Sequence, residues 1–128
     1  MTSSAFSSLP IQANLLSNIA SLGFESMTPI QQQSLPALLN NQDLFGQAKT
    51  GSGKTAAFAI GILNSLQTQV QQTQALVLCP TRELADQVSN DIRRLARALP
   101  NTKVLTLCGG KPIREQYNSL ESPPQIVI

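Results

Sequence analysis

One octapeptide, residues 48–55, has the residue types and spacing of a phosphate-binding loop. It follows the pattern G-x-x-x-x-G-K-[ST] except at its first position, where alanine replaces glycine. The glycines would let successive backbone N–H groups curl around an anion at the positive end of the next helix dipole. The lysine would reach the β- and γ-phosphates, and the final threonine hydroxyl would bind Mg²⁺ between them. The loop predicts a nucleoside triphosphate site made of Ala48, Lys49, Thr50, Gly51, Ser52, Gly53, Lys54 and Thr55.

The segments on either side of this loop fit such a site. Residues 43–47 predict a strand that leads into the loop, and residues 56–66 predict a helix that is apolar nearly all round and packs on a sheet. The alternative is a chance Gly/Ser turn with a solvated Lys54. The strand-loop-helix order argues against that alternative.

Two helices are predicted before the loop. The first begins at Ser8 and ends at Gly23, with an apolar face made of Leu15, Leu16, Ile19 and Leu22. The second begins with Thr28 as its N-cap and Pro29 at the first helical position. Pro36 is expected to kink or shorten this second helix.

Strands and helices are predicted to alternate after the loop. Residues 67–74 are glutamine-rich and predict a surface loop, and residues 75–79 form a continuous apolar run typical of a parallel strand buried on both faces. The remaining predicted elements are a helix over 83–99, a strand over 103–108, a short helix over 113–120 and a strand over 125–128. This alternation predicts an α/β fold with a right-handed parallel sheet and ligands at the carboxyl ends of its strands.

Composition sets limits on the class of protein. The chain is 41% hydrophobic and 12% charged, has two cysteines without metal-ligand spacing, and has no histidine, so His-based triads are excluded and Cys79 and Cys108 are expected to be buried free thiols. No apolar run approaches the roughly 20 residues of a membrane span, and the N-terminus lacks a basic signal-peptide region. We therefore expect a cytoplasmic protein without a membrane partner. The net charge of +2 permits an anionic partner without requiring one.

Several segments, taken in their order along the chain, resemble the first half of a DEAD-box RNA helicase core. The resemblance covers nearly the whole chain, and in that family the phosphate-binding loop ordinarily begins with alanine. The segments that carry it are Gly23-Phe24, Thr28-Pro29-Ile30-Gln31, the loop of residues 48–55, Pro80-Thr81-Arg82-Glu83-Leu84-Ala85 and Gly109-Gly110.

The resemblance implies a fold, a domain division and a set of ligands. The fold would be a parallel-sheet, RecA-like ATP-binding domain that is incomplete at its C-terminal side. Residues 1–41 would form the Q-motif region, and residues 42–128 would form the first part of the RecA-like domain. ATP, Mg²⁺ and RNA are the implied ligands.

By this resemblance, Gln31 would read adenine, because an amide can donate to and accept from the adenine edge. The alternative is that Gln31 only completes a capping box by reaching back to the backbone of Thr28. The two roles can coexist. Phe6 would stack on the adenine, whereas Phe24 would either lie near the base or pack in the core.

The resemblance implies RNA-backbone contacts from Pro80, Thr81 and Arg82 at a strand end. The alternative is a simple N-cap at Thr81 with a solvated Arg82. Gly109 and Gly110 would either allow close approach of an RNA backbone or form only a tight turn. A solvated helix face is expected for Arg93, Arg94 and Arg97.

The parent protein is expected to be an ATP-dependent RNA helicase. The stretch from Gln74 to Gly110 resembles in particular a bacterial branch of the family that acts on large-subunit ribosomal RNA, which would place the parent in ribosome assembly. The catalytic Asp-Glu-Ala-Asp and the Ser-Ala-Thr motif do not occur in the 128 residues. The chain alone is therefore expected to bind nucleotide weakly without hydrolysing it.

The family topology places strands that are not in this chain beside the strand of the phosphate-binding loop. The resulting gap would leave apolar faces and strand edges open, so the chain is expected to be poorly stable, rearranged or self-associated. A stand-alone nucleotide-binding regulatory module is an alternative function. A different phosphate-loop enzyme is disfavoured by the segments around Gln31 and Arg82.

Overall fold

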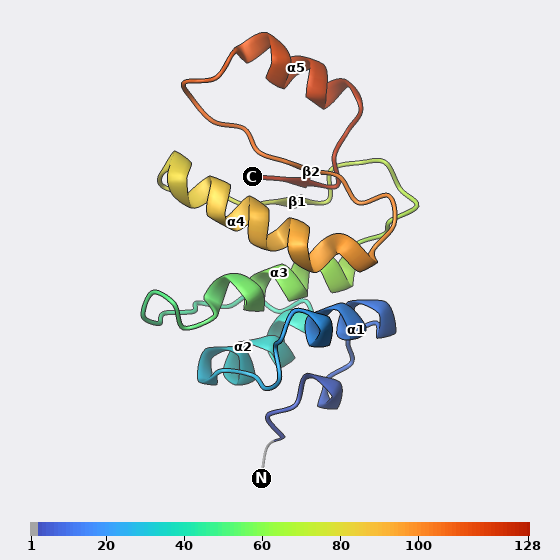
Figure 1. Ribbon diagram of the computed structural model, residues 1–128, viewed down its shortest axis with the longest axis vertical. Coiled ribbons are helices and arrows are strands. Elements are labelled where there is room, and N and C mark those ends of the chain that lie inside the picture. Colours follow the sequence, from blue (N-terminus) through green and yellow to red (C-terminus); the bar gives the residue numbers. More distant parts are fainter. Residues whose placement is uncertain (1–2) are drawn as a thin grey trace. The chain divides into compact units, whose positions relative to one another are not determined.

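The computed structural model describes residues 3–128, which divide into two compact units. The first unit ends at Ser65 and the second begins at Leu66. Helices dominate the first unit, and a small parallel sheet with helices makes up the second (Figure 1).

The first unit consists of a 3₁₀ turn, η1 (Phe6–Ser8), and the helices α1 (Ala13–Ser21), α2 (Pro29–Leu39) and α3 (Lys54–Ser65). The helices α2 and α3 pack together, and Gly61 allows their close approach. A Cβ atom added at Gly61 would lie 3.1 Å from the Cβ of Leu38. The largest fully buried apolar side chains of this unit are Leu15, Ile19, Leu35, Ile60 and Leu63.

The predicted start of the first helix, at Ser8, was wrong. The chain is extended at Leu9, with φ −104° and ψ 154°, and α1 begins only at Ala13. Pro10 accounts for the extended conformation of Leu9, because a proline disfavours the helical conformation of the residue before it. The predicted stop was right: Gly23 follows the end of α1 in the left-handed region, at φ +86°.

The predicted start of the second helix is confirmed, whereas its predicted shortening is not. Helix α2 begins at Pro29, directly after Thr28, and continues through Pro36 to Leu39. A proline here removes one hydrogen bond of the helical ladder. That loss did not end the helix.

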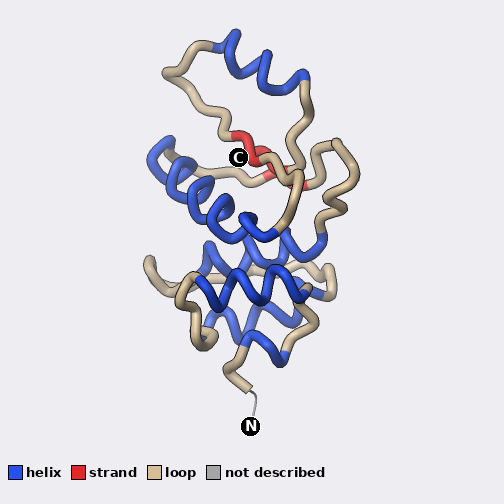
Figure 2. The backbone as a smooth tube through the Cα atoms, turned by 45° about the vertical axis from the view of Figure 1, so that its right-hand side comes forward, coloured by secondary structure: helices blue, strands red, loops and turns tan. Residues whose placement is uncertain are grey.

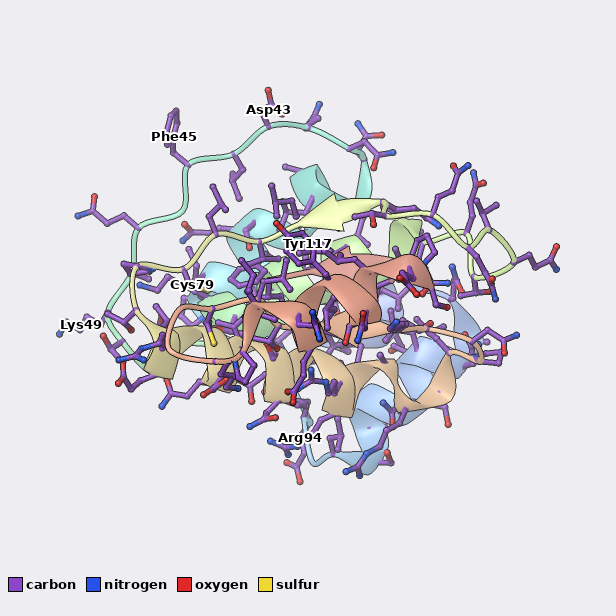
Figure 3. The ribbon with its side chains drawn as sticks, turned by 90° about the horizontal axis from the view of Figure 1, so that it is seen from above. Asp43, Phe45, Lys49, Cys79, Arg94 and Tyr117 are labelled. Carbon is purple, nitrogen blue, oxygen red and sulfur yellow. The ribbon has the colours of Figure 1, made fainter. Side chains whose placement is uncertain are left out.

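The segment before the phosphate-binding loop is not the strand that was predicted. Residues 42–49 are extended but form no ladder with any described strand. Leu44 and Phe45 are exposed, and Figure 3 shows the ring of Phe45 projecting away from the ribbon. A strand needs a neighbour for its backbone hydrogen bonds. Without one among the described residues, this sequence lies extended and open.

The second unit is built on three short strands, β1 (Ala75–Leu76), β2 (Val104–Leu105) and β3 (Ile126–Val127). They form a parallel sheet in the order β1-β3-β2, so the last strand of the chain occupies the middle. Figure 2 shows these strands in red, close to the C-terminus. Ile126 is in register with Ala75 on one side and with Val104 on the other. The predicted parallel α/β architecture is confirmed.

The strands are shorter than predicted, although backbone pairing continues beyond them. The Gln74 amide donates to the Gln125 carbonyl just before β3, and the Val77 amide donates to the Val127 carbonyl in β3. On the other side, the Leu107 amide donates to the Ile128 carbonyl. The expectation that residues 75–79 are buried on both faces was wrong. Leu76 is 66% exposed and Leu78 is 85% exposed, so nothing within residues 3–128 covers that face.

Helix α4 (Arg82–Leu95) follows β1 and continues into the 3₁₀ turn η2 (Ala96–Ala98), and α5 (Ile113–Glu121) follows β2. The sheet lies between α4 and α5 (Figure 1). Helix α4 ends at Leu95, before the predicted end at Leu99, although the Leu99 side chain is buried. Val88, Ile92 and Leu95 are buried, whereas Leu84 is exposed.

Three further features bear on function. No helix within residues 3–128 is long and apolar enough to cross a membrane. Across the same residues, no group of three His, Cys, Asp or Glu side chains is arranged to hold a metal ion. Cys79 and Cys108 are free thiols, half-buried rather than fully buried as expected.

Candidate functional site

The phosphate-binding loop has the backbone that its glycines predict. Gly51 and Gly53 both adopt positive φ angles, +81° and +96°. The Ser52 amide donates to the Lys49 carbonyl, which closes a turn at the tip of the loop. Residues other than glycine rarely adopt such φ angles, so these two glycines allow the backbone of the loop to curve.

Two polar side chains of the loop, those of Lys54 and Ser52, lie where a phosphate could bind them. The ammonium of Lys54, the first residue of α3, donates to the carbonyl of Ala48 and so folds back over the loop. The Ser52 hydroxyl is buried and has no hydrogen-bond partner among the described residues. A buried hydroxyl without a partner is costly. A phosphate oxygen in the loop would give it an acceptor.

Gln31 joins α2 to this loop. Its side-chain oxygen accepts from the Thr28 amide at 3.0 Å, and its side-chain nitrogen donates to the Gly53 carbonyl at 3.1 Å. Gln31 thus forms the bond to the Thr28 backbone that the capping-box alternative predicted. The Thr28 hydroxyl is buried and has no hydrogen-bond partner among the described residues. The amide keeps one donor and one acceptor position beyond these two bonds.

Gly53 is also the point of closest packing between the two segments. A Cβ atom at position 53 would lie 2.5 Å from the Gln31 side-chain nitrogen and 2.9 Å from the Thr28 hydroxyl. Either distance is too short for a real contact, so a side chain here would have to displace Gln31 or Thr28 in addition to adopting a positive φ angle. The structure therefore brings Thr28, Gln31 and the loop together, as the resemblance implied.

The two phenylalanines that were predicted to lie near the base pack on each other. The rings of Phe6 and Phe24 meet edge to face, with centroids 6.4 Å apart and planes at 77°. Phe6 is buried, at 4% exposure, and Phe24 is half-buried. Stacking of Phe6 on adenine stays a prediction.

Thr55 is suited to bind the metal ion that accompanies a nucleotide. Thr55 follows Lys54 in the first turn of α3, where a hydroxyl can bind a cation that also binds the phosphates. Among the described residues, no group of three His, Cys, Asp or Glu side chains is arranged to join Thr55 in holding such an ion.

In the second unit, the strand ends of β1 and β2 carry the other predicted residues. The Thr81 hydroxyl accepts from the Leu84 amide at 3.2 Å and so caps α4, as the simpler alternative proposed. Arg82 is exposed but not free, because its guanidinium donates to the Gly109 carbonyl at 3.3 Å. A Cβ atom at Gly110, which has φ +80°, would clash with that guanidinium. Arg82, Gly109 and Gly110 therefore lie together.

Arg93, Arg94 and Arg97 are exposed, as predicted, but Arg93 also has hydrogen-bond partners in the chain. Its guanidinium donates to the Val104 carbonyl at 3.1 Å and to the Thr106 hydroxyl at 3.3 Å. The Thr106 hydroxyl is 2.5 Å from that of Ser89, which donates to the Ala85 carbonyl. These bonds tie α4 to the chain of β2. Figure 3 shows that Arg94, by contrast, projects outward.

Sequence reasoning missed one polar residue beside this cluster. The side-chain amide of Gln116 in α5 bonds to the backbone on both sides of the Gly109-Gly110 turn. Only its position six residues after Gly110, inside a short helix, could have drawn attention to it.

The family follows from the ordered motifs together with one comparison. A model of the DEAD/DEAH box helicase family matches residues 28–128. The chain belongs to the DEAD/DEAH box helicase family.

Curated relatives of this DEAD/DEAH box helicase chain are much longer than it is. It is 58% identical over 113 residues to the ATP-dependent RNA helicase DbpA of Escherichia coli, covering 88% of this chain and 25% of that protein. It is 42% identical to the ATP-dependent RNA helicase CshA of Limosilactobacillus reuteri, covering 96% of this chain and 24% of that one. The chain thus spans about a quarter of these relatives.

Solved structures of DEAD-box proteins share the fold of this helicase chain. A DEAD box protein from Methanococcus jannaschii matches with a TM-score of 0.90 and 38% identity, covering 97% of this chain and 34% of that one. The RNA helicase Prp28 from Chaetomium thermophilum, bound to ADP, matches with a TM-score of 0.80 and 35% identity, covering 91% and 30%. The predicted RecA-like fold is confirmed.

Proposed function

We propose that this chain supplies the ATP-binding part, and a segment of the RNA-binding surface, of an ATP-dependent RNA helicase. The observation that carries the proposal is the bond from Gln31 to Gly53, which connects the predicted adenine-reading residue to the phosphate-binding loop. One amide thereby lies next to the phosphate-binding loop while retaining hydrogen-bonding capacity of its own.

Different groups of the loop would bind the phosphates of ATP and its metal ion. The backbone N–H groups around Gly51 and Gly53 would bind phosphate oxygens, and the Ser52 hydroxyl would gain the partner that it lacks. Lys54 would move from the Ala48 carbonyl to the phosphates. A bound Mg²⁺ would neutralise developing charge on the phosphates, and Thr55 would be its ligand from this chain.

The residues at the strand ends would hold RNA through its backbone. The Arg82 guanidinium is exposed and has N–H groups beyond the one bonded to Gly109, so it can also meet a phosphate. Exposed backbone at Gly109 and Gly110 would allow a nucleic-acid strand to approach closely. Contacts of this kind carry affinity without reading sequence.

The finer parts of the proposal rest on the resemblance of residues 74–110. We take ribosomal RNA as the parent's substrate, ribosome assembly as its process and the cytoplasm as its location. We also propose that residues 1–128 alone bind nucleotide weakly, do not hydrolyse it and associate with themselves.

The experiment is RNA-stimulated ATP hydrolysis by the full-length protein. RNA is expected to raise the rate, ribosomal RNA more than an unrelated RNA of equal length, and Lys54→Ala is expected to lower it by about 10² or more. An ATP hydrolysis rate that RNA does not change would refute the helicase proposal.

A further inference from the structure

We propose that Gln116 is a positioning residue for the RNA-binding turn at Gly109-Gly110. The inference rests on the proposed RNA-binding function and adds to it a residue outside the predicted site. Gln116 lies in α5, and its side chain is half-buried rather than solvated.

Gln116 spans the base of the turn through both ends of its amide. Its oxygen accepts from the Cys108 amide at 3.0 Å, and its nitrogen donates to the Lys111 carbonyl at 3.3 Å. Cys108 and Lys111 directly flank the glycine pair, so one side chain fixes the chain on entry to the turn and on exit from it.

The turn needs such support because its own residues provide little. Gly109 and Gly110 carry no side chains, both are exposed, and a Cβ atom at Gly109 would meet nothing within 4 Å. Glycine has more backbone freedom than any other residue. An unsupported Gly-Gly turn would sample many conformations and would lose that freedom again on binding RNA.

Arg82, the first residue of α4, also contacts this turn. Its guanidinium bonds to the Gly109 carbonyl, while Gln116 bonds to the two flanking residues. The sheet lies between the helix that begins with Arg82 and the helix that carries Gln116 (Figure 1). Side chains from α4 and from α5 therefore both bond to the backbone of the turn, and we infer that these bonds restrict its conformation.

A donor and an acceptor are both required in this role. An amide supplies the two, whereas a carboxylate can only accept. Gln116→Glu would keep the bond from the Cys108 amide and lose the bond to the Lys111 carbonyl. Gln116→Ala would lose both.

The test measures affinity of the full-length protein for a short single-stranded RNA, together with hydrogen exchange at the Cys108 amide. We expect Gln116→Ala to weaken RNA binding roughly three- to tenfold and to speed exchange at Cys108, with Gln116→Glu in between. Asn118→Ala, which alters an exposed amide on the same helix, is the matched control and should leave both quantities unchanged. Affinity for ATP should also be unchanged in all three variants.

The dependence of RNA affinity on salt separates positioning from charge. Gln116→Ala removes no cation, so the slope of log affinity against log salt should stay as in the wild type, whereas Arg82→Ala should reduce the slope. RNA affinity of Gln116→Ala equal to that of the wild type, with a lower melting temperature, would leave Gln116 a purely structural residue and overturn the inference. Failure of the wild type itself to bind RNA would instead refute the proposed function.

Discussion

The side-chain nitrogen of Gln31 donates to the main-chain carbonyl of Gly53 across 3.1 Å. This bond joins the first turn of α2 to the loop before α3. Glycine at position 53 is favoured both by this close packing and by its positive φ angle.

Two glycines of the loop should respond differently to substitution. Gly51→Ala adds a methyl group into open space and suffers only from its positive φ, which costs about 1–2 kcal/mol. Gly53→Ala suffers the same strain and also collides with Gln31 and Thr28. Urea unfolding of the full-length protein should give a larger loss of stability for Gly53→Ala. Equal losses for the two variants would contradict the packing described here.

A second pair of glycines provides a similar comparison at the strand ends. Gly109→Ala meets nothing within 4 Å and should change the free energy of unfolding by less than about 0.5 kcal/mol. Gly110→Ala has a positive φ and clashes with Arg82, so it should destabilise the protein and weaken RNA binding. Adding Arg82→Ala to Gly110→Ala should recover part of the lost stability. No recovery would mean that the clash is unimportant.

Substitutions of Thr106 and Thr102 should distinguish a hydroxyl that has hydrogen-bond partners from a buried hydroxyl that has none among the described residues. Thr106→Val removes the bonds with Ser89 and Arg93 and should lower the free energy of unfolding by about 1 kcal/mol. Thr102→Val removes a buried hydroxyl that has no partner among the described residues, so it should be neutral or stabilising. Denaturant unfolding measures both, and a larger loss for Thr102→Val would rule out the network.

Exposed apolar side chains should drive self-association of residues 1–128. Phe45 is fully exposed on the segment before the loop. Leu76 in β1 and Leu78, two residues further along the chain, are also exposed. Sedimentation velocity should show larger species as concentration rises, fewer of them for Phe45→Ser, and no change for the control Gln42→Ser. A monomer at all concentrations, with a sharp cooperative melting transition, would contradict this expectation.

Local signals in the sequence predicted the helices well. Thr28 and Pro29 marked the start of α2, and Gly23 marked the end of α1, because caps and stops depend on a few neighbouring residues. The predicted start of the first helix at Ser8 was wrong, as was the predicted shortening of the second helix at Pro36.

The errors lie in the strands, where partners are distant in sequence. The apolar run of residues 75–79 predicted burial on both faces, yet burial depends on what covers a strand, and Leu78 is left open. Residues 43–47 have the composition of a strand without a neighbour to pair with among the described residues. Gln116 went unnoticed because its role depends on a turn that only the folded chain brings to it.

The most direct test of the account is nucleotide discrimination by Gln31. Affinities for ATP and GTP would be measured on the full-length wild type, on Gln31→Ala, and on Gln33→Ala, which changes an exposed glutamine of the same helix. The account predicts that the wild type and Gln33→Ala prefer ATP by about tenfold or more, and that Gln31→Ala loses this preference. An ATP preference undiminished in Gln31→Ala would contradict the assignment of Gln31 as the adenine-reading residue.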